Sequence, residues 1–521
     1  MTIEESSDKK KTIVFNQERI SIEDVVAIAS GKARVTLSSD PAFRQAIQAG
    51  ADFLDRLLSE KGEIYGVTTG YGDSCTVAVP LSLVNELPHH LMTFHGCGLG
   101  QYLTPEQTKA VMAARLSSLS KAFSGVSYAL LEQIVRLFDN DLIPVMPSEG
   151  SVGASGDLTP LSYLAAVLCG EREVWRGNQL YPAEKALEEA GIPPLHLRPK
   201  EGLALMNGTA VMTGLTCLAY SRAAYLARLA TRITAMASFT VDGNAYHFDE
   251  MLFEVKPHPG QQQIAAWLRD DLGVDALPYR DRIQDRYSLR CAPHVIGVLQ
   301  DALPFFRQLV ENELNSANDN PIIDVTGERV LHGGHFYGGH IAFAMDSMKN
   351  AVANIADLLD RQMALLVDVR YNNGLPANLS GSEGVRASIN HGLKALQISV
   401  SAWTAEALKL TMPASVFSRS TECHNQDKVS MGTIAARDCI RVIELTEQVA
   451  AALLIAVRQG MMLRMKQNPA TTPRPNILSM YEELCREIEA VMEDRRLEPD
   501  LRTLITLIHE QAWNCYTEEN R

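Results

Sequence analysis

Residues 150–161 combine small, flexible and reactive side chains in one short stretch, Gly-Ser-Val-Gly-Ala-Ser-Gly-Asp-Leu-Thr-Pro-Leu. Gly150, Gly153 and Gly156 allow backbone conformations that other residues avoid, and they let two chain segments approach closely. Glycine-rich loops that hold phosphate use the same property. This stretch lacks the G-x-G-x-x-G and G-x-x-x-x-G-K-[ST] spacings of such loops. The pattern therefore argues against a phosphate site and indicates a different chemistry.

The tripeptide Ala154-Ser155-Gly156 contains the residue types from which a backbone electrophile can form. Attack of the Gly156 nitrogen on the Ala154 carbonyl, with loss of water, would close an imidazolone ring. Loss of a second water from Ser155 would leave an exocyclic methylene. Gly156 has no Cβ to block the attack, and ordinary side chains supply only nucleophiles, acids or bases. For the tripeptide alone, an ordinary Gly/Ser surface loop is the alternative.

The residues around this tripeptide resemble a known family. With Gly153 before it and Asp157-Leu158-Thr159-Pro160 after it, the motif is similar to that of the histidine, phenylalanine and tyrosine ammonia-lyases and related aminomutases. The resemblance runs from about residue 60 to about residue 440 through the blocks described below. It implies a 4-methylideneimidazol-5-one (MIO) group formed from residues 154–156. It also implies a homotetramer that acts on aromatic amino acids at active sites assembled from several subunits.

Two blocks ahead of this motif carry expected roles. The segment 64–72 resembles the family's Y-G-x-T-T-G-F-G loop, with Tyr71 in place of phenylalanine, and implies that Tyr65 takes the β-proton. An unperturbed tyrosine has a pKa of about 10, so this work needs surroundings that favour the phenolate. The segment 91–96 resembles the substrate-reading block and assigns Phe94 and His95 to the substrate ring. A core histidine that satisfies its own hydrogen bonds is the alternative for His95.

Two further blocks supply expected binding groups. The segment 201–209 is similar to E-G-L-A-L-x-N-G-T, which implies that Asn207 contacts the substrate amine and the cofactor. The segment 284–291 matches Q-D-x-Y-S-L-R-C, which implies that Gln284 orients the cofactor and Tyr287 assists at the amine. In the same block, Arg290 would bind the substrate carboxylate through bidentate hydrogen bonds from its guanidinium group.

The remaining blocks lie towards the C-terminus. In the segment 313–321, similar to E-x-N-S-x-x-D-N-P, Asn320 is expected to be a second carboxylate contact. The segment 333–338 departs from G-G-N-F-x-G because His335 replaces the asparagine, while Phe336 can still face the substrate ring. Gln426, in Asn-Gln-Asp, is expected at the amine and cofactor.

These residues suggest an order of substrates. In the family, the positions of Phe94 and His95 commonly read Phe-Leu for phenylalanine, His-Leu for tyrosine and Ser-His for histidine, so this chain is mixed. Histidine lyases carry glutamate where this chain has Gln426. We therefore expect tyrosine first, giving trans-4-coumarate, phenylalanine second, giving trans-cinnamate, and histidine third, giving urocanate. A 2,3-aminomutase and an inactive helical scaffold are the alternatives in function.

Composition sets the wider frame. Of 521 residues, 46% are hydrophobic and 21% charged, which is ordinary for a globular protein. The net charge of −14 argues against a nucleic-acid surface. The nine cysteines show no metal-ligand spacing, so we expect no metal, and reduced thiols in a cytoplasmic protein. The longest apolar run, residues 449–457, is too short to span a bilayer, so we expect no membrane role.

Helical spacing dominates the chain, so we expect a mainly α protein. The family resemblance implies that its long-helix bundle is of the ammonia-lyase/fumarase-like type. A capping box at Thr104–Gln107 starts one helix, and long helical patterns cover residues 209–239, 341–370, 385–412 and 433–466. We expect three segments: a smaller mixed domain at 1–208 that bears the tyrosine loop and the Ala-Ser-Gly loop, a long-helix bundle at 209–466, and a helical segment at 467–521.

Overall fold

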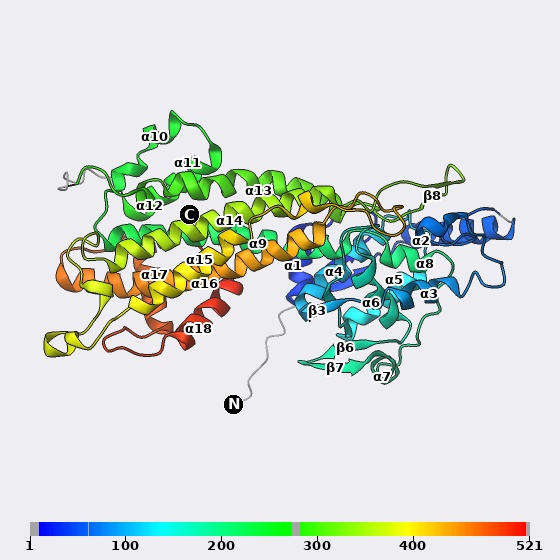
Figure 1. The fold of residues 1–521 in the computed structure, drawn as a ribbon, viewed down its shortest axis with the longest axis horizontal. Coiled ribbons are helices and arrows are strands. Elements are labelled where there is room, and N and C mark those ends of the chain that lie inside the picture. Colours follow the sequence, from blue (N-terminus) through cyan, green and yellow to red (C-terminus); the bar gives the residue numbers. More distant parts are fainter. Residues whose placement is uncertain (1–9, 61, 274–281, 517–521) are drawn as a thin grey trace. The chain divides into compact units, whose positions relative to one another are not determined.

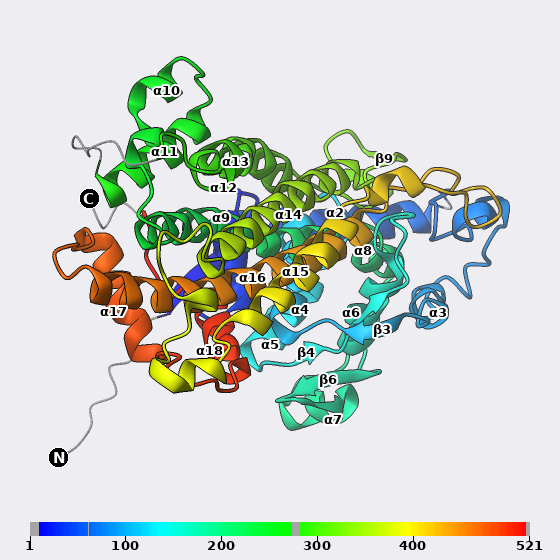
Figure 2. The same cartoon turned by 60° about the vertical axis from the view of Figure 1, so that its left-hand side comes forward.

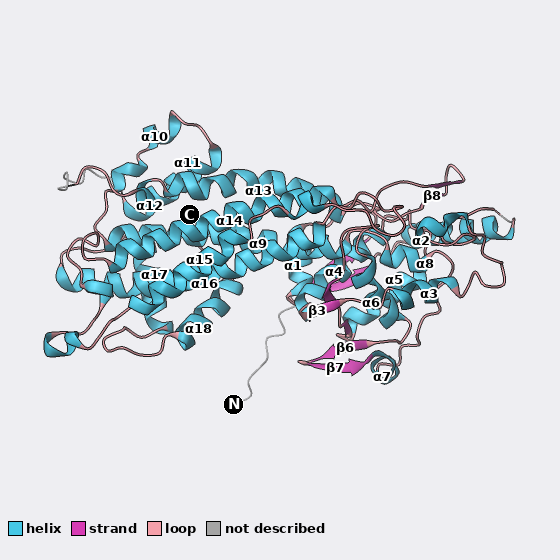
Figure 3. Cartoon of the chain, viewed as in Figure 1, coloured by secondary structure: helices cyan, strands magenta, loops and turns pink. Residues whose placement is uncertain are grey.

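The structure is a computed structural model that describes residues 10–60, 62–273 and 282–516. Its described residues are mainly helical, which confirms the expected fold class (Figure 3). Residues 1–9 of the expected N-terminal domain lie outside the described residues. Within the described residues, no helix is both long and apolar enough to cross a membrane.

The chain forms two compact units, each built from separate parts of the sequence. Unit 1 comprises residues 1–221, 307–346 and 413–437, and unit 2 comprises residues 222–306, 347–412 and 438–521. These units are defined by contacts in space. The expected boundaries near residues 208 and 466 therefore remain a prediction about the order of segments along the chain.

Unit 1 mixes helices with short strands, and every strand of the described residues belongs to it (Figure 3). Its elements are β1 (Lys11–Phe15), α1 (Ile22–Ala29), β2 (Ala33–Leu37), α2 (Pro41–Ser59), α3 (Leu87–Phe94), β3 (Leu99–Tyr102), α4 (Pro105–Leu119), α5 (Tyr128–Asp139), β4 (Ile143–Pro144), β5 (Pro147–Glu149), α6 (Leu158–Leu168), β6 (Glu173–Arg176), β7 (Gln179–Pro182), α7 (Ala183–Glu189), α8 (Glu201–Met206), β8 (Ile322–Asp324) and β9 (Arg329–Leu331).

The sheets of unit 1 are small. Strands β1 and β2 pair in parallel, with Lys11 opposite Ala33 and Phe15 opposite Leu37. The other pairings are antiparallel: β3 with β5, β4 with β6, β6 with β7, and β8 with β9. Sheets of this size do not form a layer of their own, so the core of unit 1 is helical.

Helix α4 lies at the centre of that core. It starts at the expected capping box, in which the Thr104 hydroxyl accepts from the Gln107 N–H and the Gln107 side chain accepts from the Thr104 N–H. Every residue from Ala110 to Leu119 is buried. A helix buried on all sides must be surrounded by packed segments. Helices α3, α6 and α8 also pack against one another, and the loop before α6 carries Ser155.

The regular elements in the described residues of unit 2 are helices, joined by turns and loops. Four helices contribute to both units, namely α9 (Ala210–Thr240), α13 (Ala292–Leu314), α14 (Gly339–Val367) and α16 (Gly432–Gln467). The helices of unit 2 alone are α10 (Glu250–Glu254), α11 (Pro259–Leu272), α12 (Tyr287–Arg290), α15 (Lys394–Lys409), α17 (Pro475–Glu487) and α18 (Glu498–His509). In unit 2, α15 runs alongside the unit 2 parts of α14 and α16 (Figures 1 and 2).

The helix expected over residues 385–412 is shorter in the structure, where α15 covers only Lys394–Lys409. The Asp494 carboxylate accepts from the backbone N–H groups of His391 (2.8 Å) and Gly392 (2.9 Å). These N–H groups are therefore satisfied outside a helix, and Gly392 has a left-handed φ of +53°. Sequence spacing alone could not show this contact with a segment about a hundred residues away.

Candidate active site

The Ser155 loop connects β5 to α6 and holds an unusual backbone. Ser155 has φ +54° and Gly156 has φ +76°, both in the left-handed region. The Asp157 carboxylate, fully buried just after them, accepts from the Ser151 hydroxyl (2.8 Å) and the Met212 N–H (2.9 Å). The Thr433 hydroxyl donates to the same carboxylate. Burial raises the pKa of Asp157, and these donors act in the opposite direction.

Gly156 lies directly against Gly208. A Cβ at position 156 would come within 2.0 Å of the Gly208 carbonyl oxygen. That oxygen accepts from the Asp157 N–H (2.8 Å), and the Gly208 N–H donates to the Ser155 carbonyl (3.3 Å). The backbones approach so closely that only glycine fits at 156. This packing requires glycine at 156 for a reason separate from the ring closure considered from the sequence.

Asn207 connects the Ser155 loop to the segment that contains Asn320. Its side-chain amide donates to the Ser155 carbonyl (2.8 Å), and its side-chain oxygen accepts from the Asn320 N–H (2.6 Å). Asn320 in turn accepts from the Gly333 N–H with its side-chain oxygen (2.8 Å). Asn207 is only 3% exposed, so both of its bonds are shielded from water. Three of the expected site residues, Ser155, Asn207 and Asn320, are thus brought together.

Gln426 reaches the same loop from 271 positions along the chain. Its side-chain amide donates to the Ser155 hydroxyl (3.2 Å), and its side-chain oxygen accepts from Thr421 (3.1 Å). Residues 421 and 426 also pair through their backbones, which closes a short turn. This turn fixes the direction of the Gln426 side chain. The structure therefore places Gln426 at Ser155.

Tyr65 lies in a bent loop, as the glycines around it predict. Its hydroxyl oxygen accepts from the Gly72 N–H (2.8 Å), and its ring meets His332 edge to face at 6.3 Å between centroids. His332 precedes Gly333, the residue that donates to Asn320. Burial raises the pKa of Tyr65, while the Gly72 N–H favours the phenolate. The surroundings thus contain one group that stabilises the charged form, although the net direction is upward.

Phe94 and His95 stand together at the end of α3, with ring centroids 4.4 Å apart. Phe94 is 59% exposed, and His95 is half-buried. His95 Nδ1 donates to the Leu91 carbonyl (2.9 Å), so a neutral imidazole presents Nε2 as an acceptor. Burial lowers the pKa of His95 and favours this neutral form. The His95 carbonyl accepts from Ser162 on α6 (3.2 Å), which ties this pair to the helix that follows the Ser155 loop.

Phe336 belongs to unit 1 and is half-buried, while the unusual His335 beside it is exposed. The neighbouring Tyr337 hydroxyl accepts from the Lys428 ammonium group (3.0 Å). This bond joins the segment that contains Phe336 to the segment that contains Gln426.

Gln284, Tyr287 and Arg290 form a second group, in unit 2. Arg290 donates to the Gln284 side chain (3.2 Å) and to the Asp285 carbonyl (2.9 Å). Its guanidinium carbon lies 4.7 Å from the centre of the Tyr287 ring, and Tyr287 is 71% exposed. The structure brings these three residues together and places them in a different unit from Ser155.

Three buried charged groups behind the site were not singled out from the sequence. The Arg115 guanidinium, completely buried, donates to the Asn207 carbonyl (2.8 Å) and the Asn318 side chain (3.1 Å). Lys200 forms a fully buried ion pair with Asp319, the residue that precedes Asn320 in the sequence. The only signal in the sequence is a basic residue inside the apolar stretch Val-Met-Ala-Ala-Arg-Leu at 111–116.

Comparison with known proteins identifies the class and then the family. The profile of the family described as "Aromatic amino acid lyase" matches residues 20–486. Histidine ammonia-lyase of Bos taurus is 34% identical over 99% of this chain and 78% of its own length. Histidine ammonia-lyase of Gloeobacter violaceus is 35% identical over 95% of each chain.

Solved structures give the same result. Tyrosine aminomutase from Streptomyces globisporus superimposes with a TM-score of 0.90 at 31% identity, over 96% of this chain and 97% of that chain. Histidine ammonia-lyase from Trypanosoma cruzi has a TM-score of 0.87 at 28% identity, over 96% and 94%. The protein is a carbon–nitrogen lyase. It belongs to the aromatic amino acid lyase family.

Proposed function

We propose that this chain eliminates ammonia from an aromatic L-α-amino acid, with L-histidine as the first substrate to test and urocanate as its product. The observation that carries the reaction type is the strained Ser155 loop, held by Asn207, Gln426 and Gly208 within a family of lyases. The curated relatives favour histidine, whereas the order expected from the sequence placed it third.

Residues 154–156 fit the formation of an MIO group. The left-handed φ values of Ser155 and Gly156 define a tight bend, and the Gly208 carbonyl leaves no room for a side chain at Gly156. Once formed, this group would supply a carbon electrophile that ordinary side chains lack. Asn207 and Gln426, which contact the Ser155 carbonyl and hydroxyl, are the residues that would hold it.

The remaining residues have roles that follow from their positions. Tyr65, as a phenolate, would accept the β-proton as the C–N bond breaks and ammonia departs, and the Gly72 N–H would stabilise that phenolate before it is protonated. His95 Nε2 would accept the N–H of a substrate imidazole, because its Nδ1 is already engaged with Leu91. Asn320 and Arg290 are proposed carboxylate contacts, and positioning of this kind can contribute about 7–11 kcal/mol in favourable systems.

Tyrosine is the second candidate because of one residue. Gln426 is neutral where the histidine lyases carry glutamate, so a substrate imidazole lacks the carboxylate that would favour it, while His95 Nε2 can accept a phenol proton equally well. Phenylalanine comes third, since it uses only the apolar wall that Phe94 and Phe336 would provide. The similarity to tyrosine aminomutase also keeps a 2,3-aminomutase product in view.

A substrate panel tests the proposal. Purified protein is incubated with L-histidine, L-tyrosine and L-phenylalanine, and the absorbance of each arylacrylate is followed while chiral chromatography detects any β-amino acid. Turnover of histidine alone supports the first assignment, and turnover of tyrosine alone overturns it. Gln426→Glu should raise the ratio of kcat/KM for histidine to that for tyrosine. His95→Leu and Phe94→His should also change this ratio, because both residues are proposed to contact the substrate ring. Intact mass tests the reaction type, since a chain that keeps both waters at residues 154–156 would be an inactive scaffold.

We also propose a cytoplasmic homotetramer in which Gln284, Tyr287 and Arg290 serve the Ser155 site of a second copy. The high exposure of Tyr287 supports this proposal, because a tyrosine at a shared site needs a partner to cover it. Size-exclusion chromatography with light scattering gives the oligomeric state. Mixed tetramers of Tyr65→Phe and Arg290→Ala chains should regain activity, whereas each homotetramer should not.

A further inference from the structure

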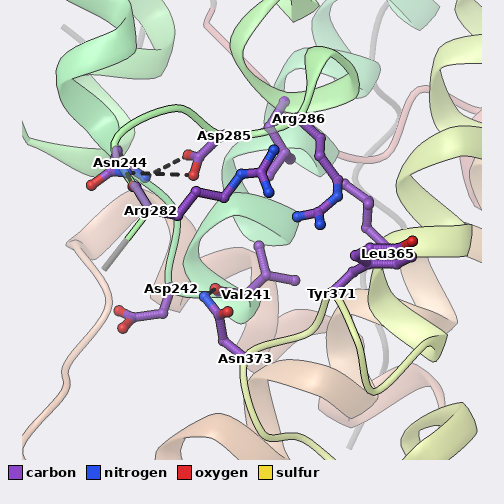
Figure 4. Close-up of a pocket in the computed structure, with 10 residues that line it drawn as sticks. Val241, Asp242, Asn244, Arg282, Asp285, Arg286, Leu365, Tyr371 and Asn373 are labelled. Atoms are coloured by element: carbon purple, nitrogen blue, oxygen red, sulfur yellow. Dashed lines mark hydrogen bonds between the residues drawn. The ribbon is translucent and has the colours of Figure 1, made fainter. Parts of the chain in front are cut away.

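Unit 2 contains a polar cavity of about 420 Å³ that the reaction described above does not use (Figure 4). Its walls come from the end of α9, the segment that leads into α12, and the turn after α14. A cavity of this size holds a small organic or inorganic ion. The side chains that enter it determine which kind of ion it favours.

Two arginines enter this cavity. Figure 4 shows the Arg282 and Arg286 side chains extending towards its centre from neighbouring turns of one segment. Arg282 donates through Nε to the Gln284 carbonyl (2.6 Å), and the Arg286 guanidinium lies 3.9 Å from the centre of the Tyr371 ring. These contacts hold both side chains in place but leave most of their N–H donors directed at the cavity. Two like charges in one cavity repel each other until an anion lies between them.

The carboxylates of the cavity wall do not neutralise these arginines. Asp285 accepts from the Asn244 backbone N–H (2.6 Å) and from the Asn244 side chain (3.4 Å). Figure 4 shows Asp285 turned towards Asn244 and the Asp242 carboxylate pointing away from the two guanidinium groups. Outside the cavity, Arg286 contributes to the low pKa of Asp368, about 2, but Arg370 is the main cause. The two guanidinium groups are therefore the charged groups that face the centre of the cavity.

The opposite wall is rigid. The Asn373 side-chain amide donates to the Val241 carbonyl (2.5 Å), and the Asn373 backbone carbonyl accepts from Arg464 (3.1 Å). The Tyr371 N–H donates to the Asp368 carbonyl (2.9 Å), which orders the backbone of the turn that carries the Tyr371 ring. A wall that is already ordered loses little entropy when a ligand binds.

We propose that this cavity is a binding site for a small oxyanion, a phosphate or a carboxylate, held between Arg282 and Arg286. A guanidinium group can donate two parallel hydrogen bonds to a pair of oxygens in such an anion, which is a bidentate contact. Arg282 contacts the Gln284 carbonyl, and the Gln284 side chain accepts from Arg290. An anion in the cavity would thus stabilise the segment that presents Gln284, Tyr287 and Arg290. The cavity shares this segment with residues proposed for the active site, but its test measures anion binding and does not depend on turnover.

The test is binding to the full-length protein. Inorganic phosphate and succinate are titrated by calorimetry and by thermal unfolding at matched ionic strength, with chloride as the reference. We expect saturable binding of at least one of the two, which identifies the oxyanion class, and at least tenfold weaker binding in Arg282→Gln and Arg286→Gln. Arg502→Gln is the matched control, because it removes one positive charge from an arginine on α18 whose side chain is 75% exposed.

A second measurement uses the wild-type protein alone, in case either variant fails to fold. Phenylglyoxal modifies accessible arginines, and peptide mass spectrometry reports each site. The bound anion should protect Arg282 and Arg286 and leave the modification of Arg502 unchanged. Absence of saturable binding to both anions, equal affinity in the Arg286→Gln variant, or uniform protection of all three arginines would overturn the proposal.

Discussion

Replacing Gly156 by alanine tests whether the close backbone contact at the Ser155 loop is essential. A Cβ at 156 would lie 2.0 Å from the Gly208 carbonyl oxygen, and Gly156 has φ +76°. The left-handed backbone costs alanine about 1–2 kcal/mol, and extra volume in a packed site costs about 1–3 kcal/mol. If the Gly208 carbonyl moves, its bond from the Asp157 N–H is lost, for about 1 kcal/mol more. We therefore expect Gly156→Ala to lower the free energy of unfolding by about 3–6 kcal/mol.

Gly31→Ala separates the backbone strain from the steric clash. Gly31 has φ +71°, and a Cβ there would meet nothing within 4 Å. This control should therefore lose only about 1–2 kcal/mol. Both variants are measured by urea unfolding, by intact mass and by turnover of the preferred substrate. Gly156→Ala should keep the mass of both waters and lose turnover, whereas Gly31→Ala should retain wild-type mass and activity.

The reasoning fails if the two alanine variants are equally destabilised. It also fails if Gly156→Ala loses both waters and turns over substrate normally, since the bend would then tolerate the side chain that the structure excludes.

Three further predictions follow from other groups. Because burial raises the pKa of Tyr65, its phenolate fraction is small at neutral pH and grows as pH increases. The value of kcat/KM should therefore rise with pH towards that raised pKa. A flat profile would argue against Tyr65 as the base. The nearby Glu422 charge also raises the pKa of Tyr65, so Glu422→Gln should move the rise to lower pH, and an unmoved profile would count against this electrostatic effect. Lys200→Met leaves the Asp319 carboxylate buried without its cation and should lower the free energy of unfolding by about 3–5 kcal/mol, as measured by urea unfolding. The double variant Lys200→Met with Asp319→Leu should recover part of that loss.

Local sequence signals predicted a helix start well where the hydrogen bonds that stabilise it lie within the same segment. Thr104 and Gln107 form the expected capping box at the start of α4. The failure at residues 385–393 has the opposite cause, because Asp494 binds backbone N–H groups there from a distant part of the chain. Helical periodicity reports which side chains are apolar, and it carries no information about such a contact.

The site shows the same division. The motifs identified Ser155, Asn207 and Gln426 as residue types, but only the fold shows that the last two contact the first across 52 and 271 positions. Arg115 and Lys200 could not be chosen as supporting residues, since a lone basic residue in a sequence is usually solvated and almost never fully buried unless paired. Their role depends on burial, which the tertiary structure alone determines.

These buried charges explain how the strained bend persists. A non-glycine residue in the left-handed region, such as Ser155, costs about 1–3 kcal/mol and survives only where the surroundings over-determine it. Here the Asp157 carboxylate anchors the loop from one side through Ser151, Met212 and Thr433. On the other side, the Arg115 guanidinium holds the facing backbone segment by donating to the Asn207 carbonyl. Because each anchor is buried, a displacement of the bend would leave a charged group without its partners, which costs more than the strain itself. The conformation of the reactive tripeptide is therefore set by groups outside it, and the short motif is informative only because the rest of the chain supplies them.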